Sequence, residues 1–330
     1  MAEKDVGMKN YLKCKLRFAD LINGTIYNGK QMVKEDDLSE QPNEYGLILE
    51  DKKGKKQVVQ RYRDIVMKAK TGEYYIVFPV ENQMNVHYAM PVRMMLYDAL
   101  AYAEQVKELE RKHEKNGEKL KGAEFLSGMK KEDKLIPIVP IVVYYGSVEW
   151  DASQDIHSML ELDDSLQNEE LKKYVPNYKI NLLNVGNVEC PENYKSGLQQ
   201  LFGMLKCKSD KTAMRNYIDK HKEKLSSVDA ETFRLLGNLL GNAEEFEKYQ
   251  KEENGGIDMC RAFDEIYKEE QEKGRIQGSI EILLDLLKEK GEISDKLLEK
   301  ITGSTDVDVV KKWIKIAAKS LTIEEFEKNI

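Results

Sequence analysis

The spacing of apolar positions in the first third of the chain predicts one helix followed by three strands. Apolar residues recur at near-helical spacing over 10–28, and the Asn28-Gly29 pair is typical of a helix end. From residue 47 the sequence becomes alternating and β-branched, which predicts a strand, a turn at Lys53-Gly54 and a longer strand through 69. EYYIVFPVEN (73–82) predicts a third strand.

The middle of the chain predicts a helix and two further strands. Residues 86–109 have the spacing of an amphipathic helix with Pro91 near its start, and the charged, glycine-punctuated segment 110–134 indicates an exposed insertion. LIPIVPIVVYYG (135–146) predicts a buried strand and NYKINLLNVG (177–186) another. The order of helix, three strands, helix, strand, strand favours an α/β or α+β domain over residues 1–188.

Only helical periodicity follows from about residue 190. It predicts a helical region over 189–252 and, after the Gly-rich ENGGID (253–258), charged C-terminal helices over 253–330 with an oligomerisation or regulatory role. The segment 259–291 is partly coiled-coil-like, but Gly274 and Gly278 weaken it and its heptad is not sustained. A homodimer is therefore compatible with the pattern without being required.

Composition excludes several classes of protein. The 330 residues are 41% hydrophobic and 34% charged, no apolar run reaches the roughly 18 residues of a membrane span, and the N-terminus lacks an apolar signal region, so we expect a cytoplasmic protein without a membrane partner. No P-loop, GxGxxG or GxSxG motif is present. A zinc site or disulfide framework is not expected, because no CxxC pair occurs among the four scattered cysteines, Cys14, Cys190, Cys207 and Cys260.

Charge is distributed unevenly along the chain. The net charge of −7 argues against a nucleic-acid partner, yet residues 1–70 carry 15 Lys and Arg against 11 Asp and Glu, whereas residues 241–330 carry 15 against 22. The basic positions include KKGKK (52–56), just before the second predicted strand. They form either a local patch that contacts nucleic acid or an ordinary solvated loop.

Two acids interrupt the apolar pattern of RYRDIVMKAKTGEYYIVFPVENQ (61–83). If Gly72-Glu73 is a two-residue hairpin loop, Asp64 lies opposite Glu81, and Gln83 points to the same face. Facing carboxylates repel unless they share a cation, and Mg²⁺ takes one or two carboxylates together with water and phosphate oxygens. This arrangement suits phosphodiester hydrolysis. Alternatively, both acids lie at strand ends and reach solvent or a nearby arginine.

An acid in one strand, followed across a hairpin by Glu-x-Lys or Glu-x-Gln, is the signature of the PD-(D/E)xK nuclease fold. This chain resembles the Rpn (recombination-promoting nuclease) branch of that superfamily, also called the PD-(D/E)xK nuclease family of transposases. The stretches that carry the resemblance are RFADLINGTIYNGKQMVKEDDL (17–38), RDIVMKA (63–69), VENQMNVHYAMPVRMMLYDALAYAEQ (80–105), GAEFLSGMKKEDKLIPIVPIVVYYG (122–146), WDASQDIHSML (150–160) and EKGRIQGSIEILLDLLKEKG (272–291).

The resemblance implies a nuclease-like domain over 1–188 and DNA cleavage that depends on Mg²⁺ or Mn²⁺. It implies that Asp64, Glu81 and Gln83 are catalytic and that the two acids are metal ligands. Gln83 occupies the position where the parent pattern has lysine. An amide can form hydrogen bonds with the attacking water or the phosphate but cannot accept its proton, so activity would depend on activation of the water by the metal.

Three further residues have two interpretations each. Asp20 either completes the metal shell from the first helix or is a surface acid. Arg93, which is paired with Tyr97 at i,i+4, either contacts a DNA phosphate or neutralises Glu81 in an ion pair. His87 is better explained as a cap or surface residue than as a base. The residues expected to contact DNA are Arg93, Arg63, Lys68, Lys55 and Lys56.

Two functions follow from these features. The first is a metal-dependent DNA endonuclease acting in recombination, mobile-element biology or defence against foreign DNA. The second is a catalytically weak scaffold of the same fold that binds DNA or protein, which Gln83 and the acidic net charge would favour. The acidic C-terminal half is either a solvated helical face or a segment that covers the site as a DNA mimic.

Overall fold

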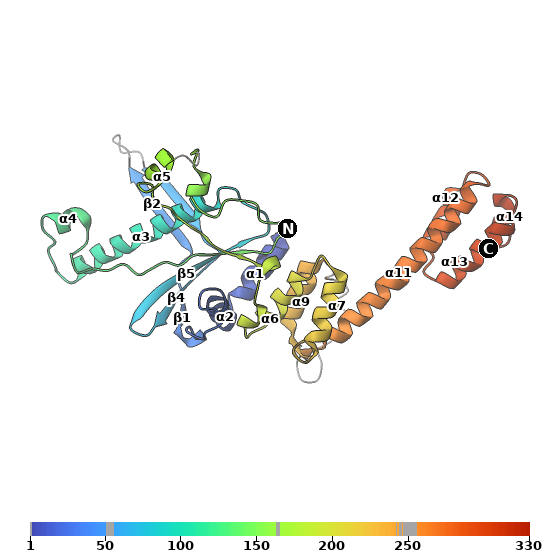
Figure 1. Cartoon of the computed structure of the whole chain (residues 1–330), viewed down its shortest axis with the longest axis horizontal. Helices are drawn as coiled ribbons and strands as arrows, with labels where there is room; N and C mark the ends of the chain where they lie inside the picture. The colour runs from blue at the N-terminus through green and yellow to red at the C-terminus, as the bar shows by residue number, and fades with distance from the viewer. Residues whose placement is uncertain (1, 51–55, 163–165, 242, 244–245, 247–255) are drawn as a thin grey trace. The chain divides into compact units, whose positions relative to one another are not determined.

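The computed structural model describes residues 2–50, 56–162, 166–241, 243, 246 and 256–330. These residues fall into two compact units, Met1–Ile257 and Asp258–Ile330 (Figure 1). The helical region expected over 189–252 lies within the first unit, and a domain boundary after residue 188 stays a prediction.

A five-stranded mixed sheet forms the centre of the first unit. Its strand order is β1-β4-β5-β6-β7, in which β4 is antiparallel to both of its neighbours and β5, β6 and β7 are parallel. The sheet and its covering helices give an α+β fold, and the specific PD-(D/E)xK core stays a prediction. The strands are β1 (Leu38–Glu40), β4 (Ile65–Thr71), β5 (Tyr74–Gln83), β6 (Ile141–Tyr144) and β7 (Asn181–Asn184).

The β4–β5 hairpin has the register expected from its sequence. The pairing runs from Thr71 opposite Tyr74 to Ile65 opposite Val80. Gly72 has a φ of +62°, a conformation that a residue without Cβ adopts at little cost in a tight two-residue loop. Continued by one position, this register brings Asp64, just before β4, to the level of Glu81.

The long strand predicted upstream of this hairpin is two separate strands. β2 (Glu44–Glu50) pairs with β3 (Lys56–Tyr62) in a two-stranded sheet of their own, and the chain bends before β4 begins. At the bend the Arg63 side chain is buried in an ion pair with Asp98, and its backbone N–H donates to the Asn43 carbonyl at 2.8 Å. These long-range contacts interrupt a pattern that looks continuous locally. The turn expected at Lys53-Gly54 lies outside the described residues.

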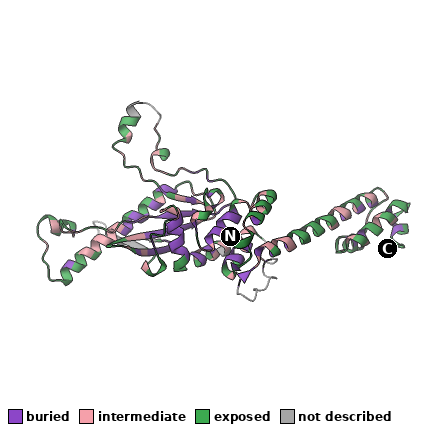
Figure 2. Ribbon diagram, turned by 60° about the horizontal axis from the view of Figure 1, so that its bottom comes forward, coloured by how far each residue is buried: buried purple, intermediate pink, exposed green. Residues whose placement is uncertain are grey.

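Helices cover the sheet with their apolar faces. The helix predicted over 10–28 is two helices, α1 (Ala2–Leu12) and α2 (Lys15–Thr25), because the chain turns at residues 13 and 14. The long amphipathic helix α3 (Met90–Lys115) extends six residues beyond its predicted end, into the segment expected to be an insertion. Its Met90, Met94 and Tyr97 pack in one cluster with Val142 and Tyr144 of β6. Buried residues are accordingly concentrated on the sheet and the helices beside it (Figure 2).

The remaining elements of the first unit are short. α6 and α9 contact each other, and α1 contacts α9 and β5. The bounds are α4 (Ala123–Ser127), α5 (Leu166–Lys172), α6 (Leu198–Lys206), α7 (Lys211–Lys220), α8 (Lys222–Leu225), α9 (Ala230–Leu240), β8 (Val228–Asp229) and β9 (Gly256–Ile257), with 3₁₀ turns at Glu35–Asp37, His157–Met159, Val185–Asn187 and Pro191–Asn193.

The second unit is built from four helices with a core of their own. α11 (Met259–Lys288) is continuous through both of its glycines and is followed by α12 (Asp295–Thr302), α13 (Val307–Lys319) and α14 (Ile323–Glu327). The three shorter helices each begin at a Ser, Asp or Thr whose side chain accepts a backbone N–H, as N-caps do. The core joins these helices to the C-terminal half of α11.

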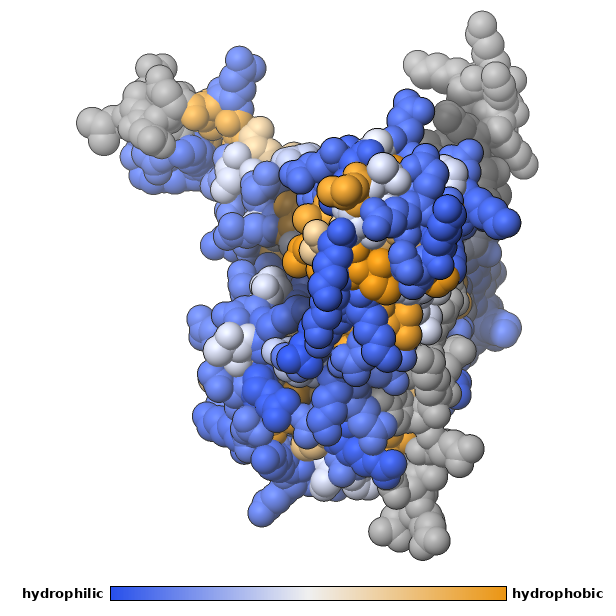
Figure 3. All heavy atoms as spheres, turned by 90° about the vertical axis from the view of Figure 1, so that its right-hand side faces the viewer, coloured by the Kyte–Doolittle hydropathy of each residue, from blue (hydrophilic) through white to orange (hydrophobic). Residues whose placement is uncertain are grey.

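The surface reflects the high content of charged residues. The face drawn in Figure 3 is mostly hydrophilic, with apolar side chains gathered in places. Among the described residues, no helix combines the length and the apolar character that crossing a membrane requires.

Candidate functional site

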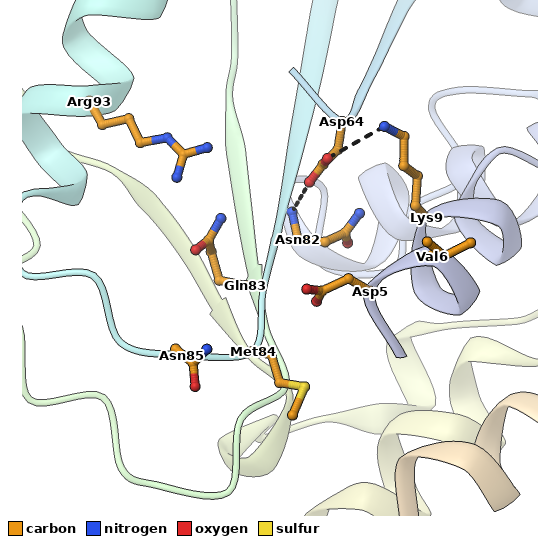
Figure 4. A pocket seen from close by; sticks show the side chains of 9 residues that line it. All are labelled: Asp5, Val6, Lys9, Asp64, Asn82, Gln83, Met84, Asn85 and Arg93. Atoms are coloured by element: carbon orange, nitrogen blue, oxygen red, sulfur yellow. Dashed lines mark hydrogen bonds and ion pairs between the residues drawn. The ribbon is translucent and has the colours of Figure 1, made fainter. Parts of the chain in front are cut away.

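A cavity of about 350 Å³ opens at the carboxyl end of β5, where the parallel strands β5 and β6 both finish. Crevices outside the carboxyl ends of parallel strands are common ligand sites in sheets covered by helices. Figure 4 shows α1 on one side of the cavity and Arg93 of α3 on the other. The lining residues are Asp5, Val6, Lys9, Asp64, Asn82, Gln83, Met84, Asn85 and Arg93.

Asp64 is held at the cavity by two contacts. Its Oδ2 accepts a hydrogen bond from the backbone N–H of Asn82 at 2.9 Å, and its Oδ1 lies 3.6 Å from the Lys9 ammonium. The side chain remains 31% exposed, so it can reach a ligand. Asp64 is therefore a positioned carboxylate at the mouth of the site.

Glu81 is buried next to this position. Its Oε2 lies 3.3 Å from Nη2 of Arg93, while the buried Oε1 has no hydrogen-bond partner among the described residues. Burial, followed by the charge of Asp64, raises the pKa of the Glu81 carboxyl to about 7, against the opposing effect of Arg93. Near neutral pH this acid can therefore be present in either protonation state.

Unpaired polar atoms are concentrated at this end of β5. Gln83 lines the cavity on the Arg93 side and the Asn82 side chain points the other way (Figure 4). Both polar atoms of the buried Asn82 amide, like Oε1 of Glu81, lack a partner among the residues that the structure describes. An unsatisfied buried polar group costs about 1–3 kcal/mol, and a bound ion or a catalytic role is one explanation for such a group.

Two arginines flank the Tyr97 ring, each with its guanidinium carbon 5.3 Å from the ring centroid. Arg93 forms an ion pair with Glu81, which is one of the two roles expected for it from the sequence. It also lines the cavity. The structure argues against a DNA contact by Arg63, because its side chain is fully buried and paired with Asp98. The irregular bend before β4 turns this arginine inward.

The other expected DNA contacts are not gathered at the cavity. Lys68 is half-buried and its ammonium lies 4.4 Å from the centroid of the Tyr75 ring. Lys55 lies outside the described residues, and of Lys56 only the backbone, at the start of β3, is described. His87 is partly buried and is not among the lining residues.

Asp20 has a structural role in this fold. It is 5% exposed, and its carboxylate accepts hydrogen bonds from the backbone N–H groups of Lys195 and Ser196 and from the Ser196 hydroxyl. These bonds tie α2 to the loop before α6. This placement argues against Asp20 as a metal ligand, because the N–H and O–H donors occupy its oxygens away from the cavity lining.

Sequence reasoning missed two charged residues of the site, Asp5 and Lys9 of α1. They are one helical turn apart and both line the cavity. Asp5 accepts a hydrogen bond from the Tyr145 hydroxyl, which ties α1 to the residue after β6. Their i,i+4 spacing was the available signal, but the helix was expected to begin only at residue 10.

The oxygen donors around the cavity fit a hard divalent cation. Asp64 and Gln83 line the cavity and supply a carboxylate and an amide oxygen, whereas Glu81 is not among the lining residues and lies buried behind them with an Oε1 that has no partner among the described residues. The described residues contain no group of three or more His, Cys, Asp or Glu side chains that could hold a metal by itself. Mg²⁺ does not require such a cage, because it commonly binds one or two carboxylates plus water and phosphate oxygens.

The comparison with protein families identifies the chain. The family described as "Putative transposase, YhgA-like" matches residues 55–233, which include β4, β5, α3 and β6. The chain belongs to this family. The match confirms the predicted relationship to the Rpn-type PD-(D/E)xK transposases. Neither a curated protein nor a solved structure matches the chain.

Proposed function

We propose that this YhgA-like family member is a DNA endonuclease that requires Mg²⁺ or Mn²⁺ and hydrolyses phosphodiester bonds. The observation that carries the proposal is the pair Asp64 and Glu81, which lie at the same level of the β4–β5 hairpin and influence each other's charge, with Asp64 lining a polar cavity, in a chain whose family is described as transposases. Such enzymes act on DNA in recombination, mobile-element movement or defence against foreign DNA.

Each residue of the site has a chemical role in this proposal. Asp64 and Glu81 hold the divalent cation, and Gln83 orients the attacking water or a phosphate oxygen by hydrogen bonding. Arg93 donates to the phosphate from the opposite wall of the cavity. The cation, when bound, polarises the phosphoryl oxygen and lowers the pKa of a water ligand.

A second candidate is a catalytically weak scaffold that binds DNA or protein through the same fold. Gln83 favours this candidate, because an amide supplies no positive charge where the parent pattern has lysine. The ion pair between Arg93 and Glu81 favours it as well, because it neutralises one of the two acids without a metal. Metal binding by the purified protein separates the two candidates.

The test is nicking of a supercoiled plasmid by the purified chain with Mg²⁺ or Mn²⁺, beside a chelator control. We expect Asp64→Ala to lower the cleavage rate at least about 100-fold, a loss of the size seen when one group stabilising a transition state is removed. Asp36→Ala, which removes an exposed acid of the turn before β1, is the matched control and should cleave like wild type.

Metal binding is measured separately by thermal unfolding. Mn²⁺ should raise the melting temperature of wild type but not of Asp64→Ala, because a ligand that binds only the folded state stabilises it by mass action. A folded wild type that shows neither cleavage nor a metal-dependent melting temperature would contradict the endonuclease and favour the scaffold.

A further inference from the structure

The cavity contains a lysine, but not at the position of the sequence motif. Gln83 stands where the parent pattern has lysine, whereas Lys9 of α1 lines the same cavity (Figure 4). α1 lies outside the part of the chain that the family comparison matches, residues 55–233. This cation therefore reaches the site only through the tertiary structure.

The contacts of α1 fix the direction in which Lys9 points. The neighbouring Met8 and Leu12 are fully buried, which fixes the face that α1 turns to the core. One turn before Lys9, Asp5 accepts the hydrogen bond from Tyr145. The Lys9 ammonium lies 3.6 Å from Oδ1 of Asp64, and its side chain is 33% exposed.

Lys9 differs in its contacts from Arg93, the other cation of the cavity. The Arg93 guanidinium is engaged by Glu81 at 3.3 Å and by the Tyr97 hydroxyl at 2.9 Å. Lys9 has a single ion pair among the described residues, at a distance longer than a hydrogen bond. An ammonium has three donors, so Lys9 can contact a further anion while it stays beside Asp64.

We propose that Lys9 supplies the positive charge that the Glu-x-Gln motif lacks, by donating hydrogen bonds from α1 to the scissile phosphate or the attacking water. This inference rests on the proposed endonuclease. In the hydrolysis, a bond forms between the water oxygen and phosphorus, and the bond from phosphorus to one sugar oxygen breaks. The water loses a proton to solvent and the leaving oxygen gains one from solvent, while Lys9 stays protonated throughout.

A purely structural role of Lys9 leads to different expectations. If Lys9 only held Asp64 in place, its loss would displace that carboxylate, weaken metal binding and leave nothing for a lysine elsewhere to restore. If Lys9 acts on the phosphate or the water, a lysine introduced at position 83 should replace it. The decisive variants are therefore Lys9→Met, Lys9→Arg and the double variant Lys9→Met/Gln83→Lys.

The experiment compares steady-state cleavage of plasmid DNA by the full-length variants with Mg²⁺. We expect Lys9→Met to lower kcat about 100-fold with a much smaller change in KM, Lys9→Arg to stay within about tenfold of wild type, and the double variant to recover at least about tenfold over Lys9→Met. Lys13→Met, at an exposed lysine just after α1, is the matched control and should cleave like wild type.

A Mn²⁺ titration followed by melting temperature gives a readout independent of cleavage. We expect Lys9→Met to bind Mn²⁺ at least as tightly as wild type, because a competing cation beside Asp64 has been removed. Weaker Mn²⁺ binding, without rescue by Gln83→Lys, would assign Lys9 to a structural role and overturn the inference.

The outcomes separate the two proposals. Cleavage that requires Asp64 but is unchanged in Lys9→Met overturns the inference about Lys9 and leaves the endonuclease intact. A wild type that does not cleave in the presence of metal removes the endonuclease and the role of Lys9 together.

Discussion

At the scale of single residues, Glu81 shows the tension between stability and function most clearly. Its carboxyl is almost completely buried, one of its oxygens has no partner among the described residues, and Asp64 adds a like charge nearby. Burying an ionised group in this way is unfavourable unless it is fully paired. A fold would tolerate such a group where a cation or substrate uses it.

Glu81→Gln is expected to stabilise the first unit at high pH in the presence of a chelator. The pKa of Glu81 is about 7 in the folded protein and has its ordinary value of 4.5 in the unfolded chain. Between pH 4.5 and 7 the folded protein therefore binds more protons than the unfolded chain, and its stability falls as pH rises through this range. The loss amounts to at most about 3 kcal/mol. Urea unfolding should show Glu81→Gln more stable than wild type at pH 8, with a smaller difference at pH 5.

Glu73→Gln is the matched control for this measurement. Glu73 is an exposed acid in the loop of the same hairpin, so its neutralisation should give no pH-dependent difference from wild type. Equal stability of Glu81→Gln and wild type at both pH values would show that burial of Glu81 has no such cost.

At the scale of elements, glycines have opposite consequences in two helices. In α2 a Cβ on Gly24 would lie 2.3 Å from a ring carbon of Tyr194, so only glycine lets the helix approach this ring. In α11 a Cβ on Gly274 would meet nothing within 4 Å. The α2 glycine is required by packing, whereas the α11 glycine only weakens its helix.

We expect Gly24→Ala to destabilise the first unit by about 1–3 kcal/mol, because the ring must move or the helix must shift. Gly274→Ala should instead stabilise the second unit by about 0.5–1 kcal/mol, the usual helix preference for alanine over glycine. Denaturant unfolding followed by circular dichroism measures both. An unchanged or raised stability of Gly24→Ala would contradict the close packing.

A second element-scale feature is the clasp at the end of α3, formed by His113 with Glu118 and Asp133. The His113 ring nitrogens lie 2.5 Å from Oε2 of Glu118 and 2.7 Å from Oδ2 of Asp133. The bond to Asp133, followed by that to Glu118, raises the pKa of His113 above its ordinary value. The pKa values of both acids are lowered, chiefly by side-chain hydrogen bonds, from Lys130 to Glu118 and from His113 to Asp133.

The clasp should therefore be strongest in mildly acidic solution. The stability that His113 contributes is complete below its ordinary pKa of 6.5 and is lost as pH rises through its raised pKa. The stability that Glu118 and Asp133 contribute is lost as pH falls through their lowered pKa values. Hydrogen exchange over 113–133 should be faster at pH 8.5 than at pH 6, after correction for intrinsic rates, and this difference should shrink in His113→Gln.

An NMR titration provides the internal control for the clasp. We expect a pKa above 6.5 for His113 and below 6.5 for His221, whose pKa is lowered by burial and neighbouring lysines. A His113 that titrates at or below the ordinary value would show that the clasp does not form.

At the scale of the whole molecule, the chain contains two units with separate cores. The core of the second unit consists of buried residues from Ile280 to Phe326 and of partly buried apolar residues between Ile276 and Ile330, all of which belong to that unit. A core confined to one unit predicts that the unit can lose its structure without the other.

Leu287→Ala tests this independence. Leu287 is fully buried in the second core, so its truncation should cost about 2–5 kcal/mol, a large fraction of the stability of so small a unit. Calorimetry should show a lowered transition for the second unit and an unchanged transition for the first. A parallel fall of both transitions would mean that the units unfold together.

The sequence by itself determined the features that depend on neighbouring residues. The two-residue loop at Gly72 and the alternation of strand side chains were sufficient to predict the β4–β5 register and the level of Asp64 with Glu81. The helical period predicted α3 in the same way. These local patterns explain why the hairpin that carries Asp64, Glu81 and Gln83 could be predicted from the sequence.

Only the tertiary structure decided which charged groups face the cavity. Arg63 is buried because Asp98 of α3 pairs with it, and Asp20 is occupied because the loop before α6 donates hydrogen bonds to it. Lys9 reaches Asp64 because α1 packs beside the end of β5. Each outcome depends on a partner distant in the chain, and the local periodicity of a sequence carries no information about such partners.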